Sequence, residues 1–471
     1  MNGRPIVLAI GSLRKATQFR YDRTCWRRST NVKKIPARER NAILQSLGAG
    51  VVPAIGLQHI QVGRLREVDA LISDLKLVEE GAASVRFVVG RYGSGKTFFL
   101  NLIRSVAQQR KFVVAQADIT TERRLYGTGG QAQSLFSELM RNLSTRSRPD
   151  GNALANVVER WIGEVDHEIR SGGGTDEDVK KEFGKRLRPL QDLVSGFDFV
   201  TVMTKYYEGY LAHNEVLQGA ALRWLRAEYR TKTEAREELG VRSIIDDAGF
   251  YDYLKLFASF VRIVGYAGLM VNIDELVVLS HRLSNTSARN RNYEAILRII
   301  NDCLQGRVEG LAFLFAGTDE CMEDPRRGLY SYEALATRLA PNRFASEGQQ
   351  DFASPVIKLE QLKPEDCFVL LVNIRNVHSG GDPGKQCVPD EALVQYLKGS
   401  QSQMGAEYFQ RPRDIAKGFV GLINMVEQYP AKTWQDHLGD FSYPQLDDSP
   451  DYSIDDEVEF HGDDEMSGFK L

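Results

Sequence analysis

A glycine-rich loop between a short hydrophobic run and an amphipathic segment constrains this chain more than any other feature. Residues 85–89 are rich in β-branched side chains, as in a buried strand, and residues 97–110 carry apolar side chains at helical spacing. The residues between match G-x-x-x-x-G-K-[ST], whose glycines let successive backbone N–H groups face phosphate oxygens. The pattern predicts a phosphate-binding loop (P-loop) formed by Gly90, Arg91, Tyr92, Gly93, Ser94, Gly95, Lys96 and Thr97.

This loop also predicts how a nucleotide would be held. The ammonium group of Lys96 is expected to reach the β- and γ-phosphates, and the hydroxyl of Thr97 is expected to bind Mg²⁺. The positive end of the following helix adds to the attraction for anions. Residues 112–117 predict a second strand, and the right-handed crossover of a strand–helix–strand unit makes its strands parallel. We therefore expect an α/β fold around a parallel sheet.

Two further hydrophobic runs end in polar residues. Residues 268–273 predict a strand that delivers Asp274 and Glu275 to its carboxyl end. In many P-loop ATPases such an aspartate holds Mg²⁺ and the adjacent carboxylate activates water, so we expect Asp274 to be a metal ligand and Glu275 the general base. Residues 311–316 predict another strand, after which Thr318 or Asp319 would orient the attacking water or sense the γ-phosphate.

Two groups of arginines follow these strands. Arginines close to a nucleotide stabilise the charge of the transition state, and a neighbouring subunit can supply them. The residues alone do not distinguish between the members of each group. One group is Arg326, Arg327, Arg338 and Arg343, and the other is Arg411 and Arg413.

The pattern of hydrophobic and charged residues divides the chain into six segments. A basic, disordered head (1–40) is followed by the first part of the ATPase core (41–130) and a helical insertion (131–260). The second part of the core (261–355), a small helical C-terminal domain that resembles a lid (356–440) and an acidic, disordered tail (441–471) complete the chain. The head carries eleven basic residues and two acidic ones, so a nucleic-acid-binding arm and a transit peptide are alternative interpretations.

Composition excludes several other classes of protein. The hydrophobic content of 42% and the charged content of 26% are ordinary for a globular protein. The net charge of −3 gives no general attraction for nucleic acid. Five cysteines without a CxxC pair disfavour a zinc site or a disulfide framework and fit a reducing cytosol. No run of apolar residues is long enough to span a membrane.

The order of these motifs resembles that of AAA+ ATPases. In that resemblance Asp274 and Glu275 are the metal and base acids, Thr318 or Asp319 is sensor 1, Arg338 is the arginine finger and Arg413 is sensor 2. Residues 60–67 resemble the N-terminal motif that contacts adenine in initiator-type members. The long helical segment before Asp274 departs from a minimal AAA+ core. The expected ligands are therefore ATP and Mg²⁺.

A narrower resemblance is to the ATP-binding proteins of bacteriophage-exclusion (BREX) defence systems. It extends over residues 38–430 and is carried by residues 90–102, 117–127, 221–228, 239–241 and 327–339. It implies a cytoplasmic ATPase that forms ATP-dependent homo-oligomers and switches or assembles a defence complex on DNA, together with other defence-system proteins. A non-hydrolysing ATP-dependent scaffold and an ATP-dependent DNA loader are the alternatives, and a kinase lacks a visible acceptor-binding signature.

Overall fold

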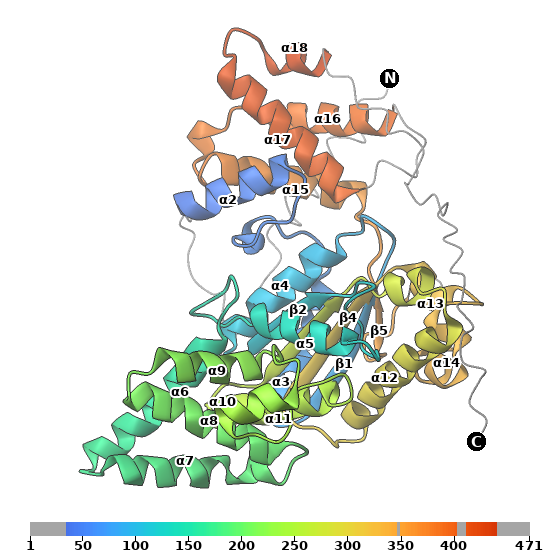
Figure 1. The fold of residues 1–471 in the computed structure, drawn as a ribbon. Helices are drawn as coiled ribbons and strands as arrows, with labels where there is room; N and C mark the ends of the chain where they lie inside the picture. The colour runs from blue at the N-terminus through green and yellow to red at the C-terminus, as the bar shows by residue number, and fades with distance from the viewer. Residues whose placement is uncertain (1–33, 346–348, 403–410, 440–471) are drawn as a thin grey trace, which may run out of the picture.

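A parallel sheet lies at the centre of the computed structural model, which describes residues 34–345, 349–402 and 411–439 (Figure 1). Within those residues, five strands form one sheet in the order β2-β3-β4-β1-β5. Every pair of neighbouring strands is parallel. The strands are β1 (Ala83–Val89), β2 (Val113–Asp118), β3 (Leu269–Asp274), β4 (Leu311–Gly317) and β5 (Val356–Lys358). This confirms the expected α/β fold of the P-loop NTPase type.

Helices cover both faces of the sheet, as a parallel sheet requires. On one face, α3 (Leu65–Glu79) and α4 (Lys96–Gln109) pack against side chains such as Val88, Met270 and Leu314. On the other face, α5 (Gln131–Arg141), α11 (Phe250–Ile263) and α12 (Thr286–Leu304) cover residues that include Phe87 and Phe313. Two short helices follow β4, α13 (Asp319–Glu323) and α14 (Glu333–Leu339).

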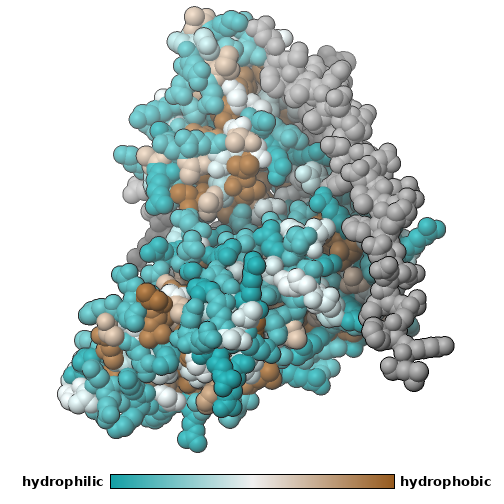
Figure 2. All heavy atoms as spheres, viewed as in Figure 1, coloured by the Kyte–Doolittle hydropathy of each residue, from teal (hydrophilic) through white to brown (hydrophobic). Residues whose placement is uncertain are grey.

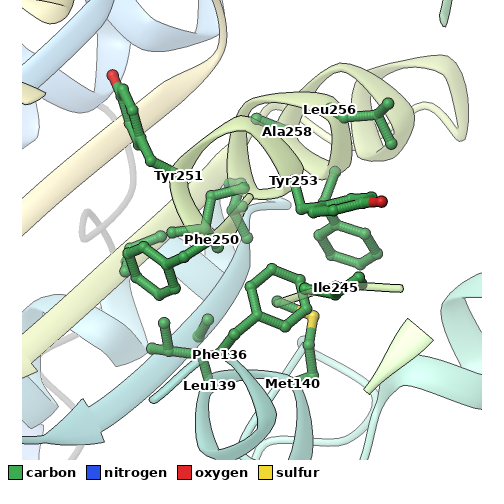
Figure 3. Close-up of a cluster of buried hydrophobic side chains, with 14 of the residues drawn as sticks. Phe136, Leu139, Met140, Ile245, Phe250, Tyr251, Tyr253, Leu256 and Ala258 are labelled. Carbon is green, nitrogen blue, oxygen red and sulfur yellow. The ribbon is translucent and has the colours of Figure 1, made fainter. Parts of the chain in front are cut away.

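The segment between β2 and β3 is helical, as the sequence pattern predicts. It contains α6 (Leu154–Ser171), α7 (Asp176–Gln191), α8 (Gly196–Leu211), α9 (Glu215–Leu225) and α10 (Lys232–Leu239), drawn in green in Figure 1. Helices α5 and α11 pack together at the junction with the sheet, where Phe136 meets Phe250 edge-on with ring centroids 6.2 Å apart (Figure 3). The insertion therefore shares one hydrophobic core with the sheet.

A hydrogen-bonded loop links the insertion to the end of β2. The carboxylate of Asp247 accepts bonds from the backbone N–H groups of Gly130, Ala132 and Gln133 at 2.8–2.9 Å, at the start of α5. The buried amide of Asn292 in α12 bonds both the N–H and the carbonyl of Tyr126. The chain that leaves β2 is thus fixed at two points beside the carboxyl edge of the sheet.

The C-terminal helices form a second hydrophobic cluster, in which an N-terminal helix takes part. Helices α15 (Pro364–His378), α16 (Asp390–Ser402), α17 (Pro412–Gln428) and α18 (Trp434–Gly439) gather at one end of the molecule (Figure 1). Helix α2 (Ala37–Gly48) packs against α15 and α17, and its Ile43 is fully buried there. The sequence pattern groups residues 41–48 with the ATPase core. Their apolar stripe is instead covered by a partner more than 300 residues away in the sequence.

Hydrophobic residues are unevenly distributed over the face of the molecule shown in Figure 2. They gather in patches over the C-terminal helices and at the lower left, over the insertion, on an otherwise hydrophilic surface. No helix in the described part of the chain is long and apolar enough to cross a membrane. Most of the basic head and all of the acidic tail lie outside the described residues; α2 begins at Ala37, within the last residues assigned to the head.

Candidate nucleotide-binding site

The glycine-rich loop connects β1 to α4 and has the backbone of a phosphate cradle. Gly93 and Gly95 adopt φ values of 80° and 85°, a left-handed conformation that side-chain-bearing residues rarely adopt. The ammonium of Lys96 donates to the carbonyls of Gly90 at 2.8 Å and Arg91 at 3.1 Å, so it lies across the mouth of the loop. Burial lowers the pKa of Lys96, an effect opposed by the charges of Asp274 and Glu275.

Two close approaches show why this loop has no room for larger residues. A Cβ on Gly90 would lie 2.7 Å from the carbonyl oxygen of Leu359, which follows β5. A Cβ on Gly93 would lie 2.7 Å from Cγ of Arg411, and the guanidinium of Arg411 stands 5.2 Å from the ring centroid of Tyr92. The loop is therefore in contact with the chain just after β5 and with the start of α17.

Asp274 joins β3 to the start of α4. The residue is 5% exposed, and its carboxylate accepts a hydrogen bond from the hydroxyl of Thr97 at 3.2 Å. The other carboxylate oxygen accepts from the N–H of Glu275 at 2.8 Å. A carboxylate and a hydroxyl are both oxygen ligands of the kind that Mg²⁺ prefers. These two side chains, predicted from motifs 177 residues apart in the sequence, lie side by side.

Glu275 leaves the strand in a strained conformation. Its φ of 62° is left-handed, which is uncommon for a residue with a side chain and recurs at functional sites. The turn leaves the Glu275 side chain partly exposed, while Leu276 remains buried and donates its N–H to the carbonyl of Ala316. Loss of water contact and the negative charges of Asp274 and Asp118 raise the pKa of the Glu275 carboxyl. A carboxylate with a raised pKa is a stronger base and is better suited to general-base catalysis at neutral pH.

Asp118 is a third acid at this edge that we did not single out from the sequence. It is the last residue of β2 and is the register partner of Asp274 in β3. Burial and the charge of Asp274 raise its pKa, and Arg123 opposes this rise. Its sequence signal is the same as that of Asp274, since both are aspartates that end a buried strand of a parallel sheet.

The residues after β4 also lie at this edge. Val89 and Gly317 are register partners, so Gly90 and Thr318 leave neighbouring strands at the same level. The hydroxyl of Thr318 accepts from the N–H of Cys321 at 3.4 Å and caps α13. The negative charge of Asp319 acts on Lys96. Thr318 is thus occupied as a helix cap, and Asp319 is the member of the pair that influences the P-loop lysine.

The candidate arginines divide between the P-loop and the outer surface. Arg338 is exposed on α14, where it donates to Oδ1 of Asn301 at 2.7 Å and to the carbonyl of Ala334 at 2.9 Å. Arg413 is exposed, and its Cδ would lie 4.0 Å from a Cβ added to Gly50, which follows α2. Arg411, two residues earlier, is the arginine that lies beside the P-loop.

The site fits a nucleotide with bound Mg²⁺ on three counts. The left-handed Gly93 and Gly95 give the loop a backbone that lets successive N–H groups face one anion. The Ser94 hydroxyl inside it is 2% exposed and has no hydrogen-bond partner, which is unusual for a buried polar group. Thr97 and Asp274 offer oxygen ligands in contact with each other. Together with the parallel sheet, these features define a P-loop nucleotide-binding protein.

Comparison with known proteins assigns the chain to a family. Residues 35–441 match the family model described as BREX system ATP-binding protein BrxC/D, so the chain belongs to this family. The match confirms the resemblance to BREX proteins. The description of the family also supports ATP as the ligand. No curated protein matches the chain.

The close approach at Gly90 generates a prediction about the loop. Gly90→Ala should lower the free energy of unfolding by about 1–3 kcal/mol, because the new methyl group would overpack against a backbone carbonyl that cannot rotate away. ATP affinity, measured by calorimetry, should fall with it. Gly163→Ala is the matched control, since nothing lies within 4 Å of a Cβ there in α6, and helix propensity favours alanine by about 1 kcal/mol. Equal stability and equal ATP affinity of the two variants would contradict the close approach at Gly90.

Proposed function

We propose that this protein is a Mg²⁺-dependent ATPase that uses ATP binding and hydrolysis to switch or assemble a DNA-associated antiphage defence complex. The observation that supports hydrolysis is the meeting of Lys96, Thr97, Asp274 and Glu275 at one edge of the sheet. Family membership supports the defence role. DNA and other defence-system proteins are the proposed partners, and cytoplasm is the proposed location.

Each residue has a distinct part in this proposal. Lys96 and the N–H groups of the loop would bind phosphate oxygens, and Thr97 and Asp274 would hold Mg²⁺, which when bound would neutralise charge on the phosphates. The Glu275 carboxylate accepts the proton of the attacking water, and its raised pKa favours that transfer. Asp319 or Thr318 orients the water. Arg411 lies nearer the loop than Arg413, so we propose Arg411 for the phosphate-sensing role that the resemblance assigned to Arg413.

Nucleotide binding should depend on the P-loop lysine. Lys96→Ala removes a charge-assisted contact to phosphate, for which we expect ATP affinity to fall roughly 10- to 100-fold. Titration calorimetry on the folded variant measures the change. Lys76→Ala, at an exposed position of α3, is the control and should bind ATP as the wild type does. Unchanged affinity in a folded Lys96→Ala protein would rule out the assignment of the P-loop.

Hydrolysis should depend on Glu275 independently of binding. Glu275→Gln keeps the shape of the side chain but cannot accept a proton, so turnover should fall roughly 10²-fold or more while ATP remains bound. Phosphate release, with and without DNA, is the measurement, and the exposed Glu320→Gln on α13 is the control. If the wild type shows no turnover under either condition, the non-hydrolysing scaffold is correct. Stoichiometric ATP-dependent retention on DNA would favour the loader.

Arg338 should act on the site of a neighbouring subunit. Its position on the surface of α14, bonded to Asn301, leads us to propose an ATP-dependent homo-oligomer in which it completes a second chain's site. Mixing Arg338→Ala with Glu275→Gln tests this, because some mixed sites then contain both functional residues. We expect two nearly inactive variants to recover ATPase activity on mixing. Absence of recovery, together with a monomeric mass in ATP and Mg²⁺, would exclude a role in trans.

A further inference from the structure

Arg64 connects three segments that are far apart in the sequence. It precedes α3 in a left-handed conformation, with φ 59° and ψ 30°. Its guanidinium donates to the carbonyl of Ser94 in the P-loop and, at 3.3 Å, to the carbonyl of Glu360. Glu360 lies in the link between β5 and α15. One side chain therefore joins the start of α3, the phosphate cradle and the entry to the C-terminal helices.

The bond to Ser94 determines which way one peptide group of the P-loop faces. In a trans peptide the carbonyl oxygen of one residue and the N–H of the next point in opposite directions. The Ser94 carbonyl faces Arg64, so the N–H of Gly95 faces the opposite way, and in the proposed phosphate cradle that side is the inner one. Inward N–H groups are those that bind phosphate oxygens in such a loop. The left-handed Gly95 accommodates this, and its missing Cβ would face Nη1 of Arg64 at 3.6 Å.

The surroundings of Arg64 disfavour its positive charge but do not remove it. Burial lowers the pKa of Arg64 to about 10, and the charges of Glu67 and Asp366 oppose the fall. The side chain therefore stays positively charged at neutral pH, immediately behind a loop that attracts anions. Both bonds to carbonyls are of the charge-assisted kind, which contribute more than neutral hydrogen bonds.

We propose that Arg64 is a positioning residue for the phosphates of ATP: by holding the Ser94–Gly95 peptide, it preorganises the P-loop to bind a nucleoside di- or triphosphate. The proposal rests on the proposed ATP site. It assigns to Arg64 a contact with the protein loop rather than with the nucleoside. The loop then loses less conformational freedom when a ligand binds, and this preorganisation raises the affinity. The gain in affinity applies to ligands whose β-phosphate enters the cradle.

Two variants of the full chain test the role of Arg64. Arg64→Met removes the charge and the donors at similar length, and Arg64→Lys keeps the charge but loses the guanidinium that reaches two carbonyls. We expect Arg64→Met to weaken ATP and ADP alike by roughly 10- to 100-fold, the range for a lost hydrogen bond to a charged group. AMP, which has no β-phosphate, should change by less than threefold. Arg64→Lys retains a charged side chain and is expected to fold. Its affinity for ATP and ADP should lie between those of the wild type and Arg64→Met.

Arg110→Met is the matched control. Arg110 makes a bidentate ion pair with Glu79 at the opposite end of α4, so its loss removes a partly buried arginine without affecting the loop. It should lower thermal stability and leave the affinity for ATP, ADP and AMP unchanged. Amide hydrogen exchange over residues 90–97 should accelerate without nucleotide in Arg64→Met and Arg64→Lys, but not in Arg110→Met.

The outcomes distinguish a failure of the role proposed for Arg64 from a failure of the proposed ATP site. Wild-type affinity in folded Arg64→Met or Arg64→Lys, while Lys96→Ala fails to bind, would overturn the role of Arg64 and leave the site intact. An equal loss for AMP, ADP and ATP would also overturn it, because Arg64 would then contact the nucleoside. Unchanged binding in Lys96→Ala would instead refute the proposed site.

Discussion

The parallel register of β1, β4 and β3 determines the geometry on which the candidate site depends. Ala83 of β1 and Leu269 of β3 both pair with Leu311 of β4, so the three strands run level to their carboxyl ends. The P-loop leaves β1 at the level where Thr318 leaves β4, and Asp274 ends β3 one strand further along. The Thr97–Asp274 hydrogen bond spans β4 and joins α4 to β3. A slip of one residue in either pairing would reverse the faces and separate this pair.

Placement of β4 between β1 and β3 also accounts for the strain at Glu275. Asp274 must stay against α4 to reach Thr97, and Leu276 must stay buried beside Ala316. The residue between them is then forced out of the strand, which its left-handed φ of 62° reflects. Such strain costs about 1–3 kcal/mol and persists only where the surroundings determine it. Here the constraints on both neighbours bring the Glu275 carboxylate near enough to Lys96 for their charges to interact.

The local features of the fold were predictable from the sequence, and the long-range contacts were not. Four strands and the P-loop lie within a residue or two of their expected positions, because hydrophobic runs and glycine spacing are local signals. Strand β5 has only three residues, too few to give a pattern. The contact of Arg411 with Tyr92, the bonds of Arg64 and the docking of α2 all depend on tertiary packing. The roles of Arg338, Glu275 and Thr318 or Asp319 remain predictions.

The C-terminal helices have a hydrophobic cluster of their own and are joined to the P-loop through individual side chains. Their hydrophobic cluster is separate from the two clusters that flank the sheet, and Phe98 of α4 packs against both it and the α3–α4 cluster. Other links include Arg64 to Glu360 and Arg411 over Tyr92. A cation–π contact at an exposed site contributes about 0.5–1 kcal/mol, which is small beside a charge-assisted bond to phosphate. The bonds of Arg64 to Ser94 and Glu360 are also charge-assisted, so Arg64 is the stronger of these two links between the P-loop and the C-terminal helices.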